Sequence, residues 1–245
     1  MIRRAMVLAA GFGTRLAPLT HTTPKPLLPV AGRPFLEHIL ALLRQGGIRE
    51  VVINLHHLGS LIEAHVGDGA RFGLAVRYSR ETTILDTGGG IKHAESLLAG
   101  EPFFVVNGDS LLEVSLRELA DFHCSRGGLA TMVLRADPDA ARYGLVELDA
   151  DARVRRIVGL PTGPQPTALR GFMFPGLHAL DPAIFAHMEP GGVFSITRTT
   201  YPAVIAKGLP IFGYEATGRW INIDTPAALA AADRELRRVP IRTIE

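Results

Sequence analysis

Residues 8–30 read LAAGFGTRLAPLTHTTPKPLLPV and guide the interpretation of the whole chain. The stretch begins within a short apolar run, residues 5–10, that predicts a buried β-strand. The glycines of the loop at 11–14 let backbone N–H groups approach a ligand closely, and such donors favour an anion. Arg15 adds a planar guanidinium that suits phosphate oxygens. We therefore interpret this stretch as a phosphate-binding loop.

Lys25 stands between Pro24 and Pro26, shortly after this loop. Proline fixes its own φ and restricts the residue before it, so we expect a stiff segment to present the lysine. The glycines alone are weak evidence, because a dinucleotide motif needs a further glycine where this chain has Leu16, and a P-loop needs Gly-Lys-Ser/Thr. The combination of glycine loop, Arg15 and proline-flanked lysine is much more specific.

With these residues the chain resembles the sugar-1-phosphate nucleotidyltransferases, whose motif runs G-x-G-T-R-L-x-P-L-T and then P-K-P-L-L-P-V. The resemblance covers about residues 2–238. It implies an α/β, Rossmann-like nucleotide-diphospho-sugar transferase fold: a mostly parallel central sheet, helices on both faces and a small antiparallel addition. It also implies transfer of a nucleoside monophosphate from a nucleoside triphosphate to a sugar 1-phosphate, with release of pyrophosphate.

The residue pattern itself predicts alternating strands and helices, which is typical of a mainly parallel sheet with right-handed crossovers. The predicted strands are 50–55, 74–78, 102–107 and 129–135, and the predicted helices are 34–45, 58–66 and 115–125. Further on, we expect a hairpin around 149–151, one strand over 171–180, a closing pair of strands at 211–214 and 219–223, and a last helix over 227–237. We predict one domain over residues 1–238 and a short tail, 239–245.

Charge and composition narrow the class of protein. The 245 residues include 26 Lys and Arg against 24 Asp and Glu, so we expect no nucleic-acid partner. The single cysteine, Cys124, allows neither an intramolecular disulfide nor a cysteine metal cluster. The first apolar run is too short for a signal peptide, and no stretch approaches the length of a membrane span. We expect a cytoplasmic protein without membrane association, either a monomer or a small homo-oligomer.

Asn107, Gly108 and Asp109 follow the predicted strand 102–107. Ligands of open α/β sheets bind beyond the carboxyl ends of the strands, and a carboxylate there can share a divalent cation with substrate phosphates. A simple Asn-Gly turn is the alternative. The resemblance assigns Asp109 to a catalytic Mg²⁺ and Asn107 to the nucleotide.

A second metal ligand is implied by residues 220–226, WINIDTP, which stand where the family has W-x-D-I-G-T-P. The aspartate of that motif holds magnesium. Its register places Asn222 on the ligand and Asp224 on the glycine, so the resemblance favours Asn222, with Asp224 as the alternative. An asparagine oxygen can ligate a hard cation.

Residues 86–90, DTGGG, precede a helix that we expect to begin near Ile91. Three glycines leave room for a flat ligand or for an anion at a helix start, although a linker is the alternative. The resemblance implies that Gly88 contacts the nucleotide and Gly89 the sugar phosphate. An acidic residue with three glycines is similar to the bacterial N-acetylmuramate-1-phosphate uridylyltransferases. Glu81 stands where the family has base-contacting residues.

Residues 143–147, YGLVE, resemble the family segment Y-G-V-V-E that approaches the sugar, which implies a role for Glu147; a structural hairpin is the alternative. The resemblance also assigns Gly176 to the sugar phosphate. Many members hold that phosphate with a lysine where this chain has Leu160, and the muramate-type enzymes lack it too. Arg170 is a candidate substitute.

By the same resemblance, Ala9, Ala10, Gly11, Gly13, Thr14 and Arg15 bind the triphosphate, and Lys25 bridges its α-phosphate and the sugar phosphate. Mg²⁺ is the implied cofactor. A phosphate monoester has a second pKa near ~6, so the sugar phosphate is largely a dianion at neutral pH and can attack without a protein nucleophile. Catalysis then needs alignment and charge neutralisation.

The sequence leaves several hypotheses for the function open. The first is transfer of UMP from UTP to N-acetylmuramate 1-phosphate or a related amino sugar phosphate. Guanylyl transfer to mannose or heptose 1-phosphate is the second, because residues 31–37, AGRPFLE, resemble the heptose type. A non-catalytic binder is favoured by Asn222 and Leu160. A glycosyltransferase of related topology would use an Asp-x-Asp motif, whose first carboxylate is missing at residues 107–109.

Overall fold

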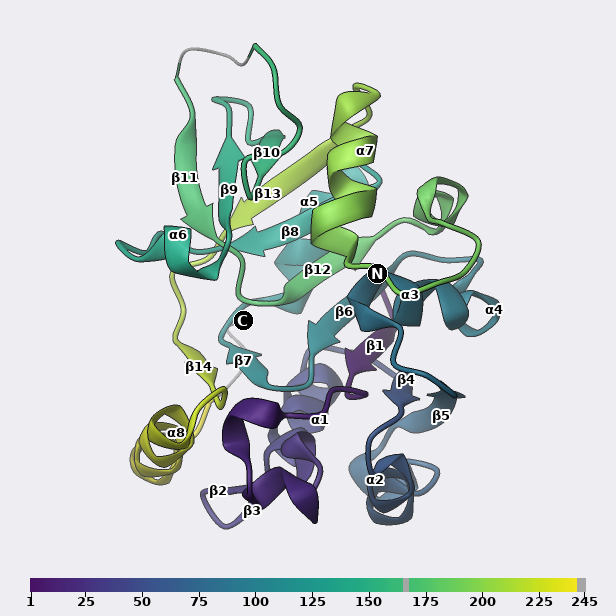
Figure 1. Ribbon diagram of the computed structural model, residues 1–245, viewed down its shortest axis with the longest axis vertical. Coiled ribbons are helices and arrows are strands. Elements are labelled where there is room, and N and C mark those ends of the chain that lie inside the picture. Colours follow the sequence, from purple (N-terminus) through teal and green to yellow (C-terminus); the bar gives the residue numbers. More distant parts are fainter. Residues whose placement is uncertain (165–167, 242–245) are drawn as a thin grey trace.

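A seven-stranded sheet forms the centre of the computed structural model, which describes residues 1–164 and 168–241. Its strand order is β13-β8-β12-β6-β1-β4-β5 (Figure 1). β12 runs antiparallel to both of its neighbours, and the other pairs are parallel. The mostly parallel central sheet is therefore confirmed.

The elements have the following bounds. The central strands are β1 (Arg4–Leu8), β4 (Glu50–Leu55), β5 (Ala75–Arg80), β6 (Phe103–Asn107), β8 (Ala130–Leu134), β12 (Leu177–Leu180) and β13 (Ile211–Glu215). Smaller sheets contain β9 (Leu145–Leu148), β10 (Val154–Ile157) and β11 (Arg170–Met173); β7 (Ser110–Leu112) and β14 (Trp220–Asn222); and β2 (Pro29–Val30) and β3 (Arg33–Pro34). The α-helices are α1 (Phe35–Gln45), α2 (Gly59–Val66), α3 (Asp86–His93), α4 (Glu95–Leu98), α5 (Leu116–Arg126), α6 (Ala140–Tyr143), α7 (Tyr201–Ala206) and α8 (Pro226–Arg238). Short 3₁₀ helices cover Thr14–Leu16, Leu19–His21, Lys25–Leu27, Ala70–Phe72 and Pro182–His187, and a π-helix covers Ile196–Thr200.

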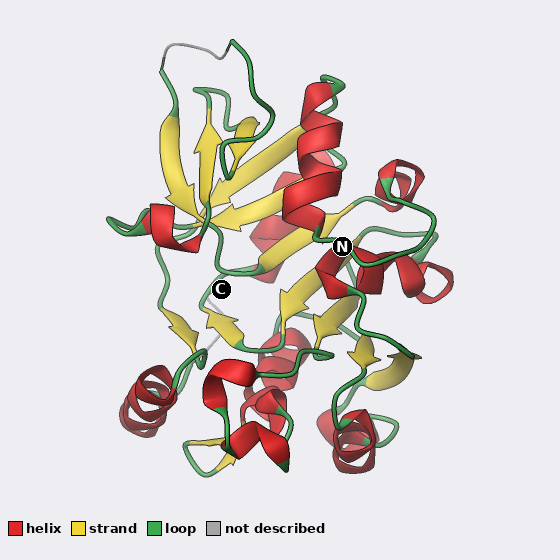
Figure 2. Cartoon of the chain, viewed as in Figure 1, coloured by secondary structure: helices red, strands yellow, loops and turns green. Residues whose placement is uncertain are grey.

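The core lies in two layers, one on each face of the central sheet. Successive residues of a strand point to opposite faces. In β1, Ala5 and Val7 therefore pack with residues of α1, α2 and α5, whereas Met6 packs with residues of α3, α4, α7 and the β9-β10-β11 sheet. Figure 2 shows helices on both sides of the strands, as predicted. The antiparallel sheet β10-β9-β11 is the predicted small addition, and its β9–β10 hairpin is confirmed.

Two predicted strand arrangements are wrong. Residues 171–180 do not form one strand, because Pro175 and Gly176, whose φ is +94°, separate β11 from β12. The two strands then join different sheets. The expected closing pair also does not form: β13 pairs with β8 at the sheet edge, whereas β14 pairs with β7. Arg219 supports the second pairing through an ion pair with Glu113.

The C-terminal helix agrees closely with its prediction. The side chain of Thr225 accepts a hydrogen bond from the backbone N–H of Ala228 and caps α8. Of the predicted tail, Ile241 packs into the core layer that contains α1, and residues 242–245 lie outside the described residues. In the part of the chain that is described, no helix is long and apolar enough to cross a membrane.

Candidate active site

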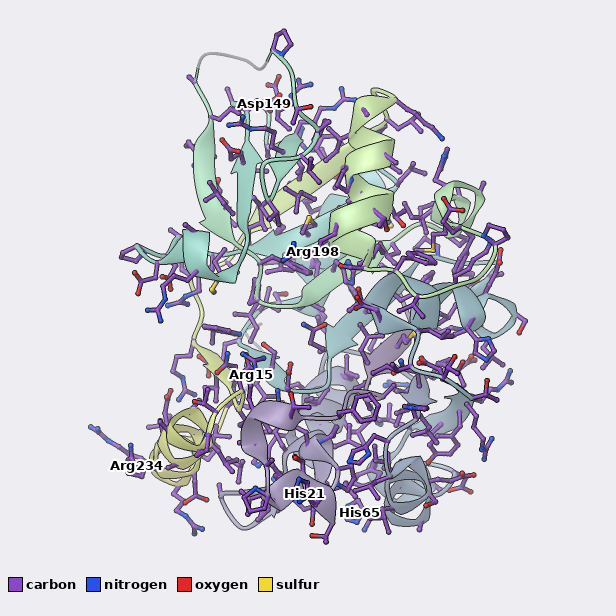
Figure 3. All side chains as sticks on the ribbon, in the orientation of Figure 1. Arg15, His21, His65, Asp149, Arg198 and Arg234 are labelled. Carbon is purple, nitrogen blue, oxygen red and sulfur yellow. The ribbon has the colours of Figure 1, made fainter. Side chains whose placement is uncertain are left out.

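A cavity of about 220 Å³ opens where β1, β4 and β6 end. Its lining includes many of the predicted site residues, since the carboxyl ends of parallel strands meet at one edge of a sheet. It is lined by Leu8, Ala9, Ala10, Gly11, Lys25, Pro26, Asn54, Glu81, Ile84, Asp86, Thr87, Asn107, Gly108 and Asp109. Arg15 lies on the N-terminal segment, on the side that faces β14 and α8 (Figure 3).

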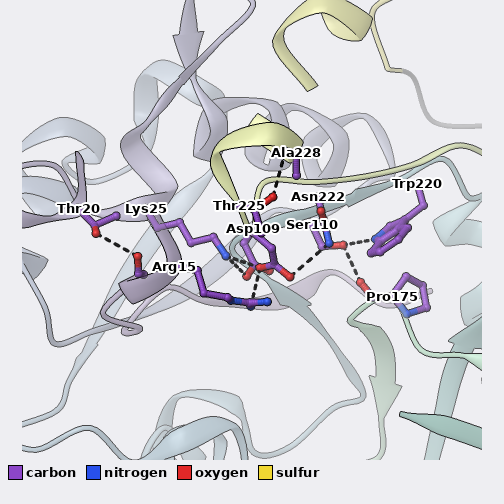
Figure 4. A network of polar contacts seen from close by, with 12 residues as sticks. Arg15, Thr20, Lys25, Asp109, Ser110, Pro175, Trp220, Asn222, Thr225 and Ala228 are labelled. Atoms are coloured by element: carbon purple, nitrogen blue, oxygen red, sulfur yellow. Dashed lines mark hydrogen bonds and ion pairs between the residues drawn. The ribbon is translucent and has the colours of Figure 1, made fainter. Parts of the chain in front are cut away.

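Lys25 is held between two carboxylates. Its Nζ lies 2.5 Å from Oδ2 of Asp109 and 2.6 Å from Oδ1 of Asp224 (Figure 4). Nη2 of Arg15 lies 3.0 Å from the same Asp224 oxygen. Only 11% of the Lys25 side chain is exposed, against 65% for Arg15. Two carboxylates and two cations therefore balance each other at the cavity.

Three distant segments supply this cluster. Lys25 begins a 3₁₀ turn, with Pro24 in extended conformation before it. Asp109 lies between β6 and β7, and Asp224 between β14 and α8. Because β7 pairs with β14 and the backbone N–H of Ile223 donates to the carbonyl of Asp109 at 3.2 Å, both carboxylates reach the same lysine.

The two glycines of the first loop have different tasks. Gly13 has a φ of +63°, its carbonyl accepts the Thr20 hydroxyl at 3.0 Å, and a Cβ there would lie 2.8 Å from Cγ2 of Thr20. Gly13 is therefore required for packing, just before the 3₁₀ turn that Thr14 begins. A Cβ on Gly11 would meet nothing within 4 Å. Gly11 lines the cavity, so its open space is available to a ligand.

Asn54, which the sequence analysis did not identify, connects two other residues of the cavity lining, Ala9 and Glu81. Its Oδ1 accepts the N–H of Ala9 at 2.7 Å, and its Nδ2 donates to Oε1 of Glu81 at 2.7 Å. The other Glu81 oxygen accepts the N–H of Leu85 at 3.0 Å. Both polar side chains are buried. The signal in the sequence was a polar residue near the end of an otherwise apolar strand, EVVINL.

The glycine-rich segment lies inside a helix, because α3 begins at Asp86 rather than near Ile91 as we expected. The N–H groups of Gly88 and Gly89 point at the carbonyl of Phe194, at 2.9 and 3.1 Å. A Cβ on Gly88 would lie 2.4 Å from the Phe194 ring, and one on Gly89 would lie 2.4 Å from the carbonyl oxygen of Gly192. These glycines permit close packing, and Asp86 and Thr87 line the cavity instead.

Three residues that the sequence analysis connects with the sugar or its phosphate do not line this cavity: Glu147, Leu160 and Arg170. Glu147 of β9 accepts two hydrogen bonds from Arg156, both at 2.7 Å. Arg170, the candidate substitute for the missing lysine, is exposed and paired with Glu215. Leu160 is exposed as well. The structure therefore brings none of these side chains to Lys25.

Gly176 packs against Asn107, which lines the cavity. Its carbonyl accepts the N–H of Asn107 at 2.8 Å, and a Cβ there would lie 2.4 Å from Nδ2 of Asn107. Beside it, the carbonyl of Pro175 accepts the Ser110 hydroxyl, which in turn accepts Nε1–H of Trp220 at 2.6 Å. These contacts join the end of β6 to the β7–β14 pair.

The pKa values of the two carboxyl groups beside Lys25 are shifted in opposite directions. Burial raises the pKa of Asp109, the neighbouring Asp224 adds to the shift, and Lys25 opposes it. Burial acts on Asp224 as well, but Lys25 and Arg15 outweigh it and lower the pKa of that carboxyl. Asp224 is therefore the more firmly ionised of the pair.

The donor set fits a hard divalent cation. Oxygens of Asp109 and Asp224 converge on one cationic nitrogen, and Mg²⁺ is bound through one or two carboxylates together with substrate phosphates. Asn222 instead donates its Nδ2–H to Oδ2 of Asp224 at 3.3 Å. Within the described ranges, no three His, Cys, Asp or Glu side chains group as a metal site, so a cation here would need further ligands from a substrate.

The chain is similar to a known protein family and to several characterised proteins over most of its length. The family described as nucleotidyl transferase matches residues 4–238. The chain is 36% identical over 232 residues to N-acetylmuramate alpha-1-phosphate uridylyltransferase of Neisseria meningitidis, which covers 94% of this chain and 96% of that relative. It is 33% identical over 235 residues to mannose-1-phosphate guanylyltransferase of Mycobacterium tuberculosis, covering 96% of this chain and 64% of the relative. It likewise spans 66% of UTP–glucose-1-phosphate uridylyltransferase of Synechocystis, at 30% identity.

Solved structures show the same fold. A putative glucose-1-phosphate thymidylyltransferase from Bacillus anthracis has a TM-score of 0.82 at 22% identity, covering 97% of this chain and 96% of that one. HddC from Yersinia pseudotuberculosis has a TM-score of 0.80 at 24% identity, covering 96% and 100%. Family match, relatives and fold agree, and the chain belongs to the nucleotidyl transferase family.

Proposed function

We propose that this protein transfers a nucleoside monophosphate from a nucleoside triphosphate to a sugar 1-phosphate and releases pyrophosphate. The observation that carries the proposal is the position of Lys25 between Asp109 and Asp224, in the lining of a cavity to which Gly11 of the glycine loop also contributes. A lysine there can contact both reacting phosphates, and alignment with charge neutralisation is the main requirement of this reaction.

We propose one orientation for the nucleotide in the cavity. The nucleoside would lie against Asn54 and Glu81, and its phosphates would extend over Gly11 toward Arg15. Arg15 is mostly exposed and, within the described part of the chain, is held by one ion pair, so its guanidinium can turn to phosphate oxygens. Lys25, which is nearly buried, would hold the α-phosphate and the attacking sugar phosphate in line.

Asp109 and Asp224 are the proposed ligands of Mg²⁺, with Asn222 orienting Asp224. The cation would neutralise phosphate charge when bound. This choice rests on the convergence of the two carboxylates, whereas the motif register favours Asn222. The other tasks belong to the chain: Lys25 and Arg15 supply positive charge, and the N–H groups of the loop orient the phosphates.

For the substrate we favour UTP with N-acetylmuramate 1-phosphate or a related amino sugar phosphate. The N. meningitidis relative with this specificity matches the chain over nearly its whole length. Leu160 agrees with it, because the muramate-type enzymes also lack the sugar-phosphate lysine. Guanylyl transfer to mannose or heptose 1-phosphate is the second candidate, supported by the M. tuberculosis relative.

A matrix of four nucleoside triphosphates against several sugar 1-phosphates tests the proposal, with pyrophosphate release as the readout and Asp109→Asn as the blank. We expect the largest kcat/KM for UTP with the N-acetylmuramate substrate, and loss of activity in EDTA. A maximum with GTP and a mannose or heptose phosphate would select the second candidate. If every pair is silent although nucleotides bind, the chain is a non-catalytic binder.

A further inference from the structure

The ammonium group of Lys25 lies at the point where the two proposed metal ligands converge. Its distances of 2.5 and 2.6 Å to the Asp109 and Asp224 oxygens are those of short, charge-assisted hydrogen bonds. In the described residues Nζ has no other hydrogen-bond partner. The ammonium group therefore occupies the position in which the two carboxylates would hold a metal ion.

This arrangement compensates two carboxylates that would otherwise repel each other. Asp109 and Asp224 are 31% and 23% exposed, and water screens their charges only in part. Arg15 pairs with Asp224 from the solvent side, and among the described residues Lys25 is the one cation shared by both carboxylates. A divalent ion that binds without a nucleotide would have to bind next to this ammonium group or displace it.

A divalent cation without a nucleotide would find few ligands at this position. The described residues offer no third carboxylate, histidine or cysteine at this point. A triphosphate changes the balance in two ways, because its oxygens supply the missing metal ligands and its negative charge receives the displaced ammonium. Pro24 and Pro26 hold the backbone, so the flexible side chain alone needs to move.

We propose that Lys25 is an exchangeable internal cation. In the free protein it neutralises the Asp109–Asp224 pair and excludes free divalent metal. The metal enters only as its complex with a nucleotide, and the displaced ammonium moves onto the phosphates. The inference rests on the proposed function, since it needs a nucleotide that carries a metal, and it adds an order of loading that the reaction itself does not require.

Binding of Mn²⁺ without nucleotide, followed by electron paramagnetic resonance, tests the exclusion. We expect Lys25→Met to bind one Mn²⁺ at least about tenfold more tightly than the wild type, a difference of ~1.4 kcal/mol. Adding Asp109→Asn to that variant should abolish the gain. Lys92→Met is the matched control, because Lys92 is also a largely buried, ion-paired lysine, and it should behave as the wild type does.

Equal Mn²⁺ affinity of the wild type and Lys25→Met would overturn the proposal. Lys25→Arg keeps the positive charge and should exclude Mn²⁺ as the wild type does; tight Mn²⁺ binding by this variant would also count against it. Thermal melts identify a variant that fails to fold, and Lys25→Gln then replaces Lys25→Met.

Lysine signals give a direct view of the exchange, since the chain has only three lysines, Lys25, Lys92 and Lys207. In the full chain labelled with ¹⁵N,¹³C-lysine, the Lys25 signal is the one missing from Lys25→Met. We expect Mg²⁺ alone to leave it unchanged, and Mg²⁺ with a non-hydrolysable UTP or GTP analogue to shift it. A shift with Mg²⁺ alone, or none with a bound analogue, would refute the exchange. Failure of the proposed function appears separately, as absence of pyrophosphate release.

Discussion

The side-chain amide of Asn222 donates a hydrogen bond to Oδ2 of Asp224 at 3.3 Å, while Oδ1 of Asp224 faces Lys25 at 2.6 Å. Asn222 therefore lies behind Asp224 with respect to the lysine. The carboxylate, and not the amide, shares Lys25 with Asp109. From this order of contacts we propose for Asp224 the ligand role that the motif register favours for Asn222.

We expect Asp224→Asn to lower kcat by about a hundredfold or more and to raise the Mg²⁺ concentration needed for half-maximal rate, because it removes one of two carboxylates. Asn222→Ala should cost about tenfold, as loss of a group that orients a ligand does. Pyrophosphate release measured against Mg²⁺ concentration compares them. The opposite order would show that Asn222 is the ligand and Asp224 its support.

Asp109→Asn should remove nearly all turnover, with only partial recovery in excess Mg²⁺, because an amide binds a hard cation more weakly than a carboxylate. Pyrophosphate release measured against Mg²⁺ concentration tests this prediction as well. A variant with the Mg²⁺ dependence of the wild type would mean that residues 107–109 form only a turn.

Lys25→Ala should leave the fold intact and lower turnover by on the order of a hundredfold or more, the usual cost of losing a charge contact in the transition state. Lys25→Arg should restore little, because a planar fork does not replace a compact ammonium between two prolines. Lys92→Ala controls for the loss of one charge, because Lys92 does not line the cavity. Steady-state rates and circular dichroism check this, and a normal rate in Lys25→Ala would exclude its bridging role.

Gly11 and Gly88 should respond differently to alanine. Gly11→Ala meets no atom within 4 Å, so we expect a stability change within about 0.5 kcal/mol but a raised KM for the nucleotide. Gly88→Ala would push a Cβ to 2.4 Å from the Phe194 ring and should cost about 1–3 kcal/mol. Urea unfolding and nucleotide titrations measure both effects. An unchanged KM in Gly11→Ala would mean that no ligand approaches that residue closely.

Stability should fall in acid through a buried histidine. His178 is hydrogen-bonded to the Tyr201 hydroxyl, and burial lowers its pKa to about 3. The unfolded chain takes up this proton near pH 6.5, so the stabilising contribution is complete above that pH and is lost between 6.5 and 3. From pH 7 to pH 5 the wild type should lose about 2 kcal/mol more than His178→Phe in urea unfolding. Equal losses would show that His178 does not remain neutral in the fold.

The sequence by itself determined several local elements. It also identified two members of the charged cluster, Arg15 and Lys25. β4, α1 and the β9–β10 hairpin follow from hydrophobic periodicity and turn residues, which act over a few neighbouring positions. Arg15 and Lys25 could be selected because they belong to one continuous motif. Their proposed roles remain predictions for the experiments above.

Only the tertiary structure decided which side chains meet. Pairing of β14 with β7 sets the direction of Asp224, and no local pattern contains that pairing. The contacts that place Gly88 in a packed helix come from Phe194, far along the chain. Asn54 of β4 donates a hydrogen bond to Glu81, which follows β5. A motif specifies residue types at fixed spacing, whereas the direction in which each side chain points depends on packing between segments distant in sequence.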